Sequence, residues 1–323
     1  PYPKLVTVTK GAVYDVIVDL RPESKSFRRW CAVIISDENC RQVYVPAGCG
    51  HGFVCIEDAV MLYLQGGTFE PKFEKDIYPF DNILGIVWHH IEDVPYIISD
   101  KDSSAPKFLD QFSEVGTQIS PVRRVLIIGA NGQVGGALTE AFGAQNVIGT
   151  YSTTPVDGFV RFDLGEVAHN PQIAIDMMTM CHPEIVCICA GRTWVDGCEN
   201  EGEIPFTVNC TGPQAVVRAA KMVGAKTVYF STDYVFDGAN EGKLYSEEDL
   251  PSPVNVYGAS KLAGERAVLL EDGNSLVLRT TGVYGPEKQG KNFVYQLHRA
   301  FSAGRSLECA ADNFGTPTYN RDL

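Results

Sequence analysis

The sequence predicts two domains of different fold class, an all-β barrel or sandwich followed by an α/β doubly wound parallel sheet. In the N-terminal third, short apolar segments follow one another at even spacing and are separated by Gly, Pro, Asp and Asn. After residue 122, buried apolar runs alternate with stretches of helical period. A length of 323 residues also suits two domains.

The composition argues against two classes of binding partner, nucleic acids and membranes. The formal net charge is -13, which gives no support for binding to nucleic acid or to an anionic membrane surface. No apolar run approaches the roughly 20 residues of a membrane span, so no membrane partner is expected. The ten cysteines lack the spacing of a disulfide framework, and we interpret them as reduced thiols of a cytoplasmic protein.

The first domain is expected to span residues 1–108. Its apolar segments predict strands at 5–8, 13–18, 30–35, 42–45, 52–56 and 60–64. Lys10 and Gly11 stand between the first two segments and predict a hairpin. Residues 69–108 contain several prolines and are expected to be irregular. The polar stretch 109–121, which ends at a proline, is predicted to be a linker.

The second domain is expected to span residues 122–323. Strands are predicted at 125–128, 147–149, 185–189, 227–230 and 276–279, with helices near 133–143, 170–181, 205–223 and 258–270. This alternation is typical of a doubly wound parallel sheet, in which ligands bind beyond the carboxyl ends of the strands.

A glycine-rich turn connects the first strand of this domain to its first helix. Gly129, Gly132 and Gly135 follow the buried run Val125–Ile128. Such glycines let the backbone approach a pyrophosphate, and the helix N-terminus supplies N–H groups and positive potential. The pattern therefore predicts a dinucleotide site, although glycine-rich turns of this kind also occur for packing reasons.

Two further stretches carry groups suited to ketone reduction. Tyr257 and Lys261 are four residues apart, which places them on one helix face about one turn apart. An ammonium beside a phenol lowers the pKa of that phenol, which can then give a proton to a carbonyl oxygen. Ser231 and Thr232 end a predicted strand, where a hydroxyl can contact the same oxygen or instead cap a turn.

With these residues in view, the second domain resembles the extended short-chain dehydrogenase/reductases, and within them the dTDP-4-dehydrorhamnose reductases. The matching segments are Gly129-x2-Gly132-x2-Gly135, Asp163-Leu164, Ala190-Gly191, Val208-Asn209, Ser231-Thr-Asp-Tyr-Val-Phe236, Tyr257-Gly-x-Ser-Lys261, Gly264-Glu265 and Arg279-Thr280. The resemblance implies that Thr232, Tyr257 and Lys261 are catalytic and that Tyr234 contacts the sugar. It implies a cofactor site made by Gly129, Asn131, Gly132, Gln133, Val134, Ser152, Asp163, Leu164, Ala190, Gly191, Tyr257 and Lys261.

The choice between NADP and NAD depends on the end of the second strand. An acidic residue there would bind the ribose 2′-hydroxyl and select NAD. The chain instead has the hydroxyl-rich run 150–154, with Arg161 as the nearest cation. We therefore expect NADP, with NAD as the alternative. Asp163, assigned to adenine by the resemblance, could instead be a helix cap.

The first domain resembles the cupin-fold dTDP-4-dehydrorhamnose 3,5-epimerases. The matching segments are Lys4-Leu-Val, Gly11-x-Val-Tyr-Asp-Val16, Asp19-Leu-Arg21, Pro46-x-Gly48, His51-Gly-Phe53 and Ser99-Asp-Lys-Asp102. The resemblance implies a ligand contact for His51, no metal, and pairing of two copies through this domain. The family's basic His belongs to a segment before Lys4 and its acidic Tyr position is Phe69. We therefore expect a degenerate or truncated epimerase, with Asp100 or Asp102 as a remnant of the acid that orients the His.

Together these features predict NADPH-dependent reduction of the C4 ketone of a nucleotide-linked 4-keto-6-deoxyhexose, such as dTDP- or UDP-4-dehydrorhamnose. Two alternatives stay open. One is a non-catalytic NADP-binding regulatory protein similar to the regulatory subunit of methionine adenosyltransferase. The other is an epimerase or dehydratase of the same extended family, which would keep NAD tightly bound. The chain is also expected to be shortened at both ends relative to these families.

Overall fold

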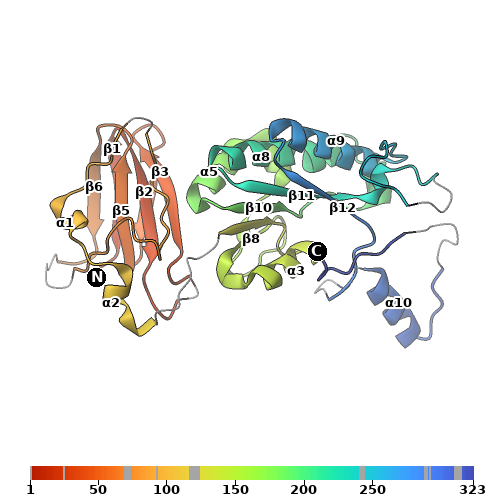
Figure 1. Ribbon diagram of the computed structural model, residues 1–323, viewed down its shortest axis with the longest axis horizontal. Helices are drawn as coiled ribbons and strands as arrows, with labels where there is room; N and C mark the ends of the chain where they lie inside the picture. Colours follow the sequence, from red (N-terminus) through yellow and green to blue (C-terminus); the bar gives the residue numbers. More distant parts are fainter. Residues whose placement is uncertain are drawn as a thin grey trace. The chain divides into compact units, whose positions relative to one another are not determined.

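The computed structural model describes residues 2–24, 26–68, 74–91, 94–115, 124–239, 244–286, 290, 292–308 and 315–323. By its internal contacts the chain divides into two compact units, one of residues Pro1–Arg123 with Thr179–His182 and one of Arg124–Met178 with Pro183–Leu323. Figure 1 shows strands dominating the first unit and alternating strands and helices in the second.

The first unit contains two three-stranded antiparallel sheets. One sheet has the order β4-β1-β6, formed by Gln42–Val45, Lys4–Lys10 and Val60–Gln65. The other has the order β3-β2-β5, formed by Trp30–Ser36, Ala12–Asp19 and Cys49–Cys55. All six predicted strands are therefore present, and the predicted all-β class is confirmed.

The predicted hairpin at Lys10 and Gly11 is wrong. The two strands that flank these residues belong to different sheets, and each pairs with strands later in the chain. Gly11 has φ +73°, and a Cβ there would lie 2.1 Å from the carbonyl oxygen of Asp58. The absence of a side chain at Gly11 therefore lets the chain cross from one sheet to the other. Between the two sheets, Val6, Val13 and other apolar side chains form a common core.

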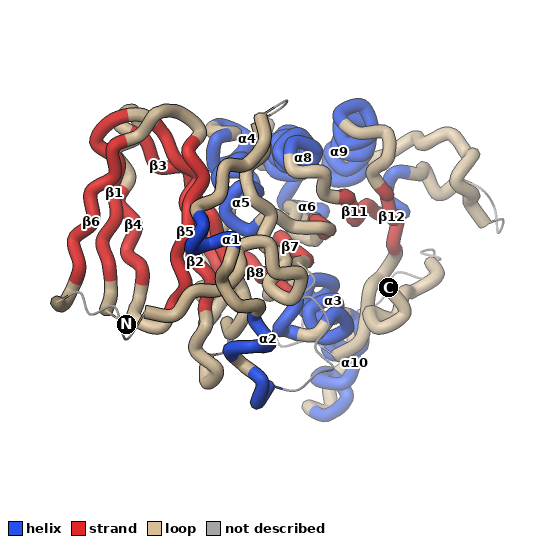
Figure 2. Tube along the Cα trace, turned by 60° about the vertical axis from the view of Figure 1, so that its left-hand side comes forward, coloured by secondary structure: helices blue, strands red, loops and turns tan. Residues whose placement is uncertain are grey.

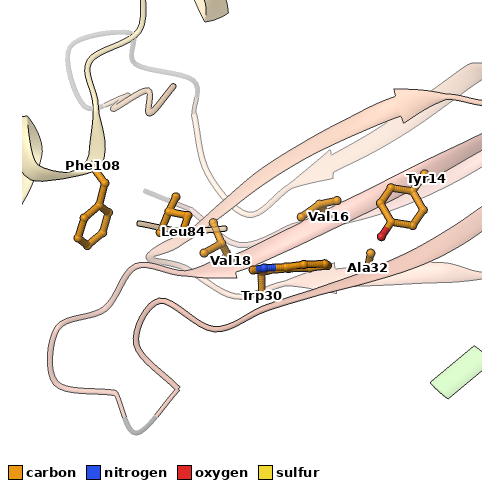
Figure 3. Close-up of a cluster of buried hydrophobic side chains, with 7 residues drawn as sticks. All are labelled: Tyr14, Val16, Val18, Trp30, Ala32, Leu84 and Phe108. Carbon is orange, nitrogen blue, oxygen red and sulfur yellow. The ribbon is translucent and has the colours of Figure 1, made fainter. Parts of the chain in front are cut away.

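A second core covers the opposite face of β2. Figure 3 shows this cluster, which consists of Tyr14, Val16, Val18, Trp30, Ala32, Leu84 and Phe108. Two short helices follow, α1 (Asp100–Ser103) and α2 (Phe108–Gln111), and then a 3₁₀ turn (Ser113–Val115). Leu109 and Phe112, which fall inside the predicted linker, pack against this core. Burial on both faces explains why β2 reads as an almost continuous apolar run.

The second unit is built on a six-stranded parallel sheet, which confirms the predicted doubly wound class. Its order is β12-β11-β10-β7-β8-β9. The strands are β7 (Val125–Ile128), β8 (Val147–Tyr151), β9 (Val160–Arg161), β10 (Ile185–Ile188), β11 (Lys226–Thr232) and β12 (Leu276–Thr280). Because β7 and β10 are central and enclosed on both sides, their predicted apolar runs match the observed strands closely.

Helices cover both faces of this sheet. Figures 1 and 2 show α8 and α9 over one face and α3 over the other. The helices are α3 (Gln133–Phe142), α4 (Leu164–His169), α5 (Gln172–Cys181), α6 (Val195–Cys198), α7 (Ile204–Phe206), α8 (Gly212–Met222), α9 (Val256–Glu271) and α10 (Phe293–Ser302), with a short 3₁₀ turn at Ala144–Asn146 and another at Asp233–Val235. A π-helical turn, Thr207–Thr211, separates α7 from α8, so the helix predicted over 205–223 is interrupted.

Candidate active site

The glycine-rich turn after β7 has the conformation that a close backbone approach requires. Gly129 has φ +84°, and a Cβ there would lie 2.9 Å from the backbone nitrogen of Ala190. A Cβ on Gly135 would lie 2.3 Å from the carbonyl oxygen of Gly129. The backbone N–H of Gly129 donates to Thr150 Oγ1 at 3.1 Å. Glycine is therefore needed at both positions. This need would arise equally from close packing and from a site that binds phosphate.

The turn leads directly into α3, which begins at Gln133 after the N-cap Gly132. Gln133 Nε2 is buried and has no hydrogen-bond partner among the described residues. Asn131 lies in the turn, and Val134 packs against the core under the helix. An open cradle, a helix N-terminus and an orphaned amide donor together fit a pyrophosphate.

Ala190 and Gly191 follow β10 and lie beside this turn. The backbone N–H of Ala190 donates to the carbonyl oxygen of Ile128 at 2.9 Å. A Cβ on Gly191 would lie 2.8 Å from Asn209 Oδ1 and 3.8 Å from Lys261 Nζ. The structure therefore brings Gly191, which is predicted to contact the cofactor, close to Lys261, which is predicted to be catalytic.

The residues assigned to the adenosine end of the cofactor lie around β8, β9 and α4. Ser152 directly follows β8 and is half-buried. Asp163 caps α4, since its Oδ1 accepts the backbone N–H of Glu166 at 3.1 Å, and Leu164 is buried. The helix-cap alternative for Asp163 is thus observed, and its contact with adenine stays a prediction.

Arg161, the cation closest to the expected 2′-phosphate position, is already paired. Its guanidinium donates to both carboxylate oxygens of Glu166, at 2.8 and 2.6 Å. Both side chains are about half exposed, so solvent weakens the pair. A 2′-phosphate at this position would compete with Glu166 for Arg161.

The three predicted catalytic residues come from two elements. Thr232 is the last residue of β11, and Tyr257 and Lys261 lie in the first two turns of α9. The Thr232 side chain lies near enough to Tyr257 to act on its pKa. Its hydroxyl donates to Asp233 Oδ1 at 3.1 Å and accepts the backbone N–H of Tyr234 at 3.2 Å. Lys261 Nζ lies 4.0 Å from the centre of the Tyr229 ring. The ring of Tyr234, the predicted sugar contact, meets that of Tyr257 edge to face at 5.6 Å between centroids.

Burial dominates the electrostatics of this group. It raises the pKa of Tyr257 to about 12, against the opposing effect of the Thr232 side chain. It lowers the pKa of Lys261 to about 7, against the opposing effect of the Glu265 carboxylate. The pKa of Tyr257 is thus raised rather than lowered as expected from Lys261, because desolvation of the phenol is the largest effect on it.

Sequence reasoning assigned no role to Asn209, which lies in the π-helical turn. Its Oδ1 accepts the backbone N–H of Arg192 at 2.8 Å, and its Nδ2 donates to Ser260 Oγ at 2.9 Å. The hydroxyl of Tyr229 donates to its carbonyl oxygen at 2.7 Å. Asn209 thus connects the loop after β10 to α9 and β11. The only sequence signal was the Val208-Asn209 pair within the family resemblance.

The first unit contains a cavity of about 1140 Å³. Its lining includes Lys4, His51, Tyr63, Gln65 and His89. His51 Nε2 lies 2.6 Å from Asp15 Oδ1, and both side chains are buried. Asp15 was not predicted, because an acidic residue inside an apolar strand carries no recognisable motif.

The acids that had been predicted to orient a histidine have other partners. Asp102 Oδ2 accepts a hydrogen bond from Ser99 Oγ at 2.7 Å, and the backbone N–H of Asp102 donates to Ser99 Oγ at 3.0 Å. Asp100 stands in the first turn of α1. Both residues therefore belong to a capped helix start. Phe69 lies outside the described residues.

A twisted parallel sheet, a glycine turn opening onto a helix, and a Tyr–Lys pair one helical turn apart define the Rossmann-type short-chain dehydrogenase/reductase class. Residues 123–323 match the family model described as "RmlD substrate binding domain", and the chain belongs to this family. Residues 1–110 match the dTDP-4-dehydrorhamnose 3,5-epimerase model, so the chain fuses an epimerase-family domain to a reductase-family domain.

Individual relatives agree with the match of residues 123–323. A dTDP-4-dehydrorhamnose reductase of Mycobacterium tuberculosis is 36% identical over 205 residues, which cover 62% of this chain and 63% of the relative. The Escherichia coli reductase is 33% identical over 199 residues, which cover 60% and 62%. The Bacillus anthracis reductase, solved in complex with NADP, is 34% identical with a TM-score of 0.54, covering 62% of this chain and 67% of that one.

The chain thus spans somewhat less than two thirds of the length of these curated relatives. None of the described helices is long and apolar enough to cross a membrane.

Proposed function

We propose that residues 122–323 reduce the C4 ketone of a nucleotide-linked 4-keto-6-deoxyhexose, such as dTDP- or UDP-4-dehydrorhamnose, with NADPH as the reductant. The observation that carries this proposal is the position of Lys261 beside Gly191, with Tyr257 one turn earlier on α9 and Thr232 near Tyr257. When bound, the cofactor supplies the hydride. The relatives that bear the reductase name support the substrate class.

Side chains of this domain would donate the proton that the ketone oxygen receives. Because the pKa of Tyr257 is about 12, its phenol is protonated near neutral pH and can donate to the ketone oxygen as negative charge develops there. The Thr232 hydroxyl, which lies near Tyr257, would position the ketone oxygen. The Lys261 ammonium would stabilise the phenolate that remains.

NADP is the proposed cofactor rather than NAD. The end of β8 carries hydroxyl side chains and no acidic residue between Thr150 and Thr154, and the B. anthracis relative was solved with NADP. The Arg161–Glu166 pair moderates this preference, since Arg161 must leave a carboxylate to contact a 2′-phosphate.

For the first unit we propose an epimerase-type barrel that binds a nucleotide sugar, with His51 as a ligand contact in the cavity. We also propose that it pairs with a second copy. The edge strand β6 exposes Val60, Leu62 and Leu64, each between 49 and 60% accessible. An apolar row on an open sheet edge favours association. Light scattering of Leu62→Lys should give half the mass of the parent if this row forms the contact.

Measurement of turnover distinguishes the proposed reductase from the non-catalytic regulatory protein. Oxidation of NADPH, followed at 340 nm with dTDP-4-keto-6-deoxyhexose, is the expected result. Tyr257→Phe is the control, since it removes the phenol hydroxyl and keeps the aromatic ring and the other residues of the predicted cofactor site. Tight NADP binding with no oxidation in the unmodified protein would favour the regulatory alternative. NAD released from the purified protein by denaturation would favour an epimerase or dehydratase.

A further inference from the structure

Helix α9 carries three ionisable side chains on one face, because Tyr257, Lys261 and Glu265 follow one another at intervals of four residues. Two of them belong to the proposed catalytic group, and the third, Glu265, is as buried as Lys261, with 4% of each residue exposed. We propose that Glu265 is a positioning residue for this reaction: its carboxylate is the counter-charge of the Lys261 ammonium and holds α9 against the strand end that carries Thr232. This inference rests on the proposed reductase function.

The hydrogen bonds of Glu265 join α9 to two strands at once. Glu265 Oε1 accepts from Ser231 Oγ and from Arg279 Nε, the latter at 3.0 Å, and its Oε2 accepts from Arg279 Nη2 at 2.7 Å. Ser231 on β11 pairs directly with Arg279 on β12, and Thr232 is the next residue. One carboxylate therefore sets the position of the helix that carries Tyr257 and Lys261 relative to Thr232.

The surroundings of Lys261 contain few other charges. From β11 the Tyr229 ring faces its ammonium at 4.0 Å, and Cys189 acts on it from the end of β10. On its own helix the neighbours are Tyr257 and Glu265. Burial raises the pKa values of Cys189, Tyr229 and Tyr257 above their usual range, so these groups are neutral near pH 7. Within the described residues, Glu265 is then the carboxylate that opposes the desolvation of Lys261.

Removing this charge should lower the pKa of Lys261. A unit charge about 6 Å away, at an effective dielectric constant of about 20, changes a pKa by about two units. Since Arg279 already neutralises part of the Glu265 charge, we expect a shift of about one unit in Glu265→Gln. Neutral Lys261 cannot stabilise the phenolate, so the alkaline limb of the kcat–pH profile should move to lower pH by the same amount.

The test uses the full chain labelled with [ε-13C]lysine. The Lys261 signal, assigned by its loss in Lys261→Met, is titrated by NMR in the parent and in Glu265→Gln. Glu271→Gln is the matched control, because Glu271 ends the same helix and pairs with Arg218 in the same bidentate way, at 2.9 Å. The kcat–pH profile is measured on the same samples with NADPH and the keto sugar.

A midpoint about one pH unit lower in Glu265→Gln, and unchanged in Glu271→Gln, supports the proposal. An unchanged midpoint, or a loss of kcat that is equal at all pH values, overturns it, because a purely structural role would act in that way. If Glu265→Gln does not fold, Glu265→Asp replaces it, with a smaller downward shift expected and an unchanged midpoint as the refuting result. The NMR titration needs no turnover, so a shifted midpoint in a chain that never oxidises NADPH refutes the reductase function alone.

Discussion

The glycine turn offers the sharpest quantitative test of the cofactor site. Gly129→Ala would place a methyl group 2.9 Å from the backbone nitrogen of Ala190 and 3.0 Å from its Cα and Cβ, at a residue with φ +84°. A left-handed conformation costs an alanine about 1–2 kcal/mol, and overpacking of this kind costs about 1–3 kcal/mol. We therefore expect the free energy of unfolding of the second unit to fall by about 3 kcal/mol.

The same substitution should weaken binding of NADP by at least tenfold, because the turn must move to accept the methyl group. Gly136→Ala is the matched control: it lies one turn along α3, and its Cβ would meet its nearest neighbour, the carbonyl oxygen of Ala130, at 3.8 Å. Alanine is the better helix former there, so the control should gain up to about 1 kcal/mol. Urea unfolding and calorimetric titration with NADP measure both quantities. Equal unfolding curves and equal affinities for the two variants would refute the reasoning.

Three further predictions follow from individual contacts. Tyr257→Phe should lower kcat by about 100- to 10,000-fold while changing NADP affinity little, as steady-state kinetics and calorimetry would show; full activity would exclude Tyr257 as the acid. Glu166→Gln should release Arg161 and lower the KM for NADPH a few-fold relative to NADH; an unchanged KM ratio would mean that Arg161 does not reach the 2′-phosphate. Burial alone would raise the pKa of Asp19, but hydrogen bonds, first from Arg21, outweigh it and lower the pKa. The stability that Asp19 contributes is therefore present above about pH 4 and is lost as the pH falls below it, so acid unfolding of Asp19→Asn should show a flatter pH dependence.

The periodic patterns of the sequence were sufficient to predict most strands and helices, but not to predict which strands pair. The runs at 125–128 and 42–45 became strands with the predicted bounds. In the first run all four residues are buried, as a continuous apolar run in a parallel sheet predicts. The hairpin at Gly11 failed for a different reason. A Lys-Gly pair between two strands is compatible with a tight turn and equally with a crossing between sheets, and only contacts with distant strands decide which occurs.

Short elements escaped prediction for a related reason. β9 contains two residues and α4 six, which is too few for a period to emerge. The π-helical turn around Asn209 depends on hydrogen bonds to Arg192 and Ser260, which are far away along the chain. No local pattern carries that information.

By itself, the sequence determined the two fold classes, the glycine turn, and the spacing that puts Tyr257 and Lys261 on one helix face, since each depends on residues close together in the chain. Only the tertiary structure decided the charges that act on these residues. The carboxylate behind Lys261, the pairing of Arg161 with Glu166 and the contact of His51 with Asp15 each join separate elements or turns. Burial, which sets the pKa values of Tyr257 and Lys261, likewise arises only when helix and sheet pack together.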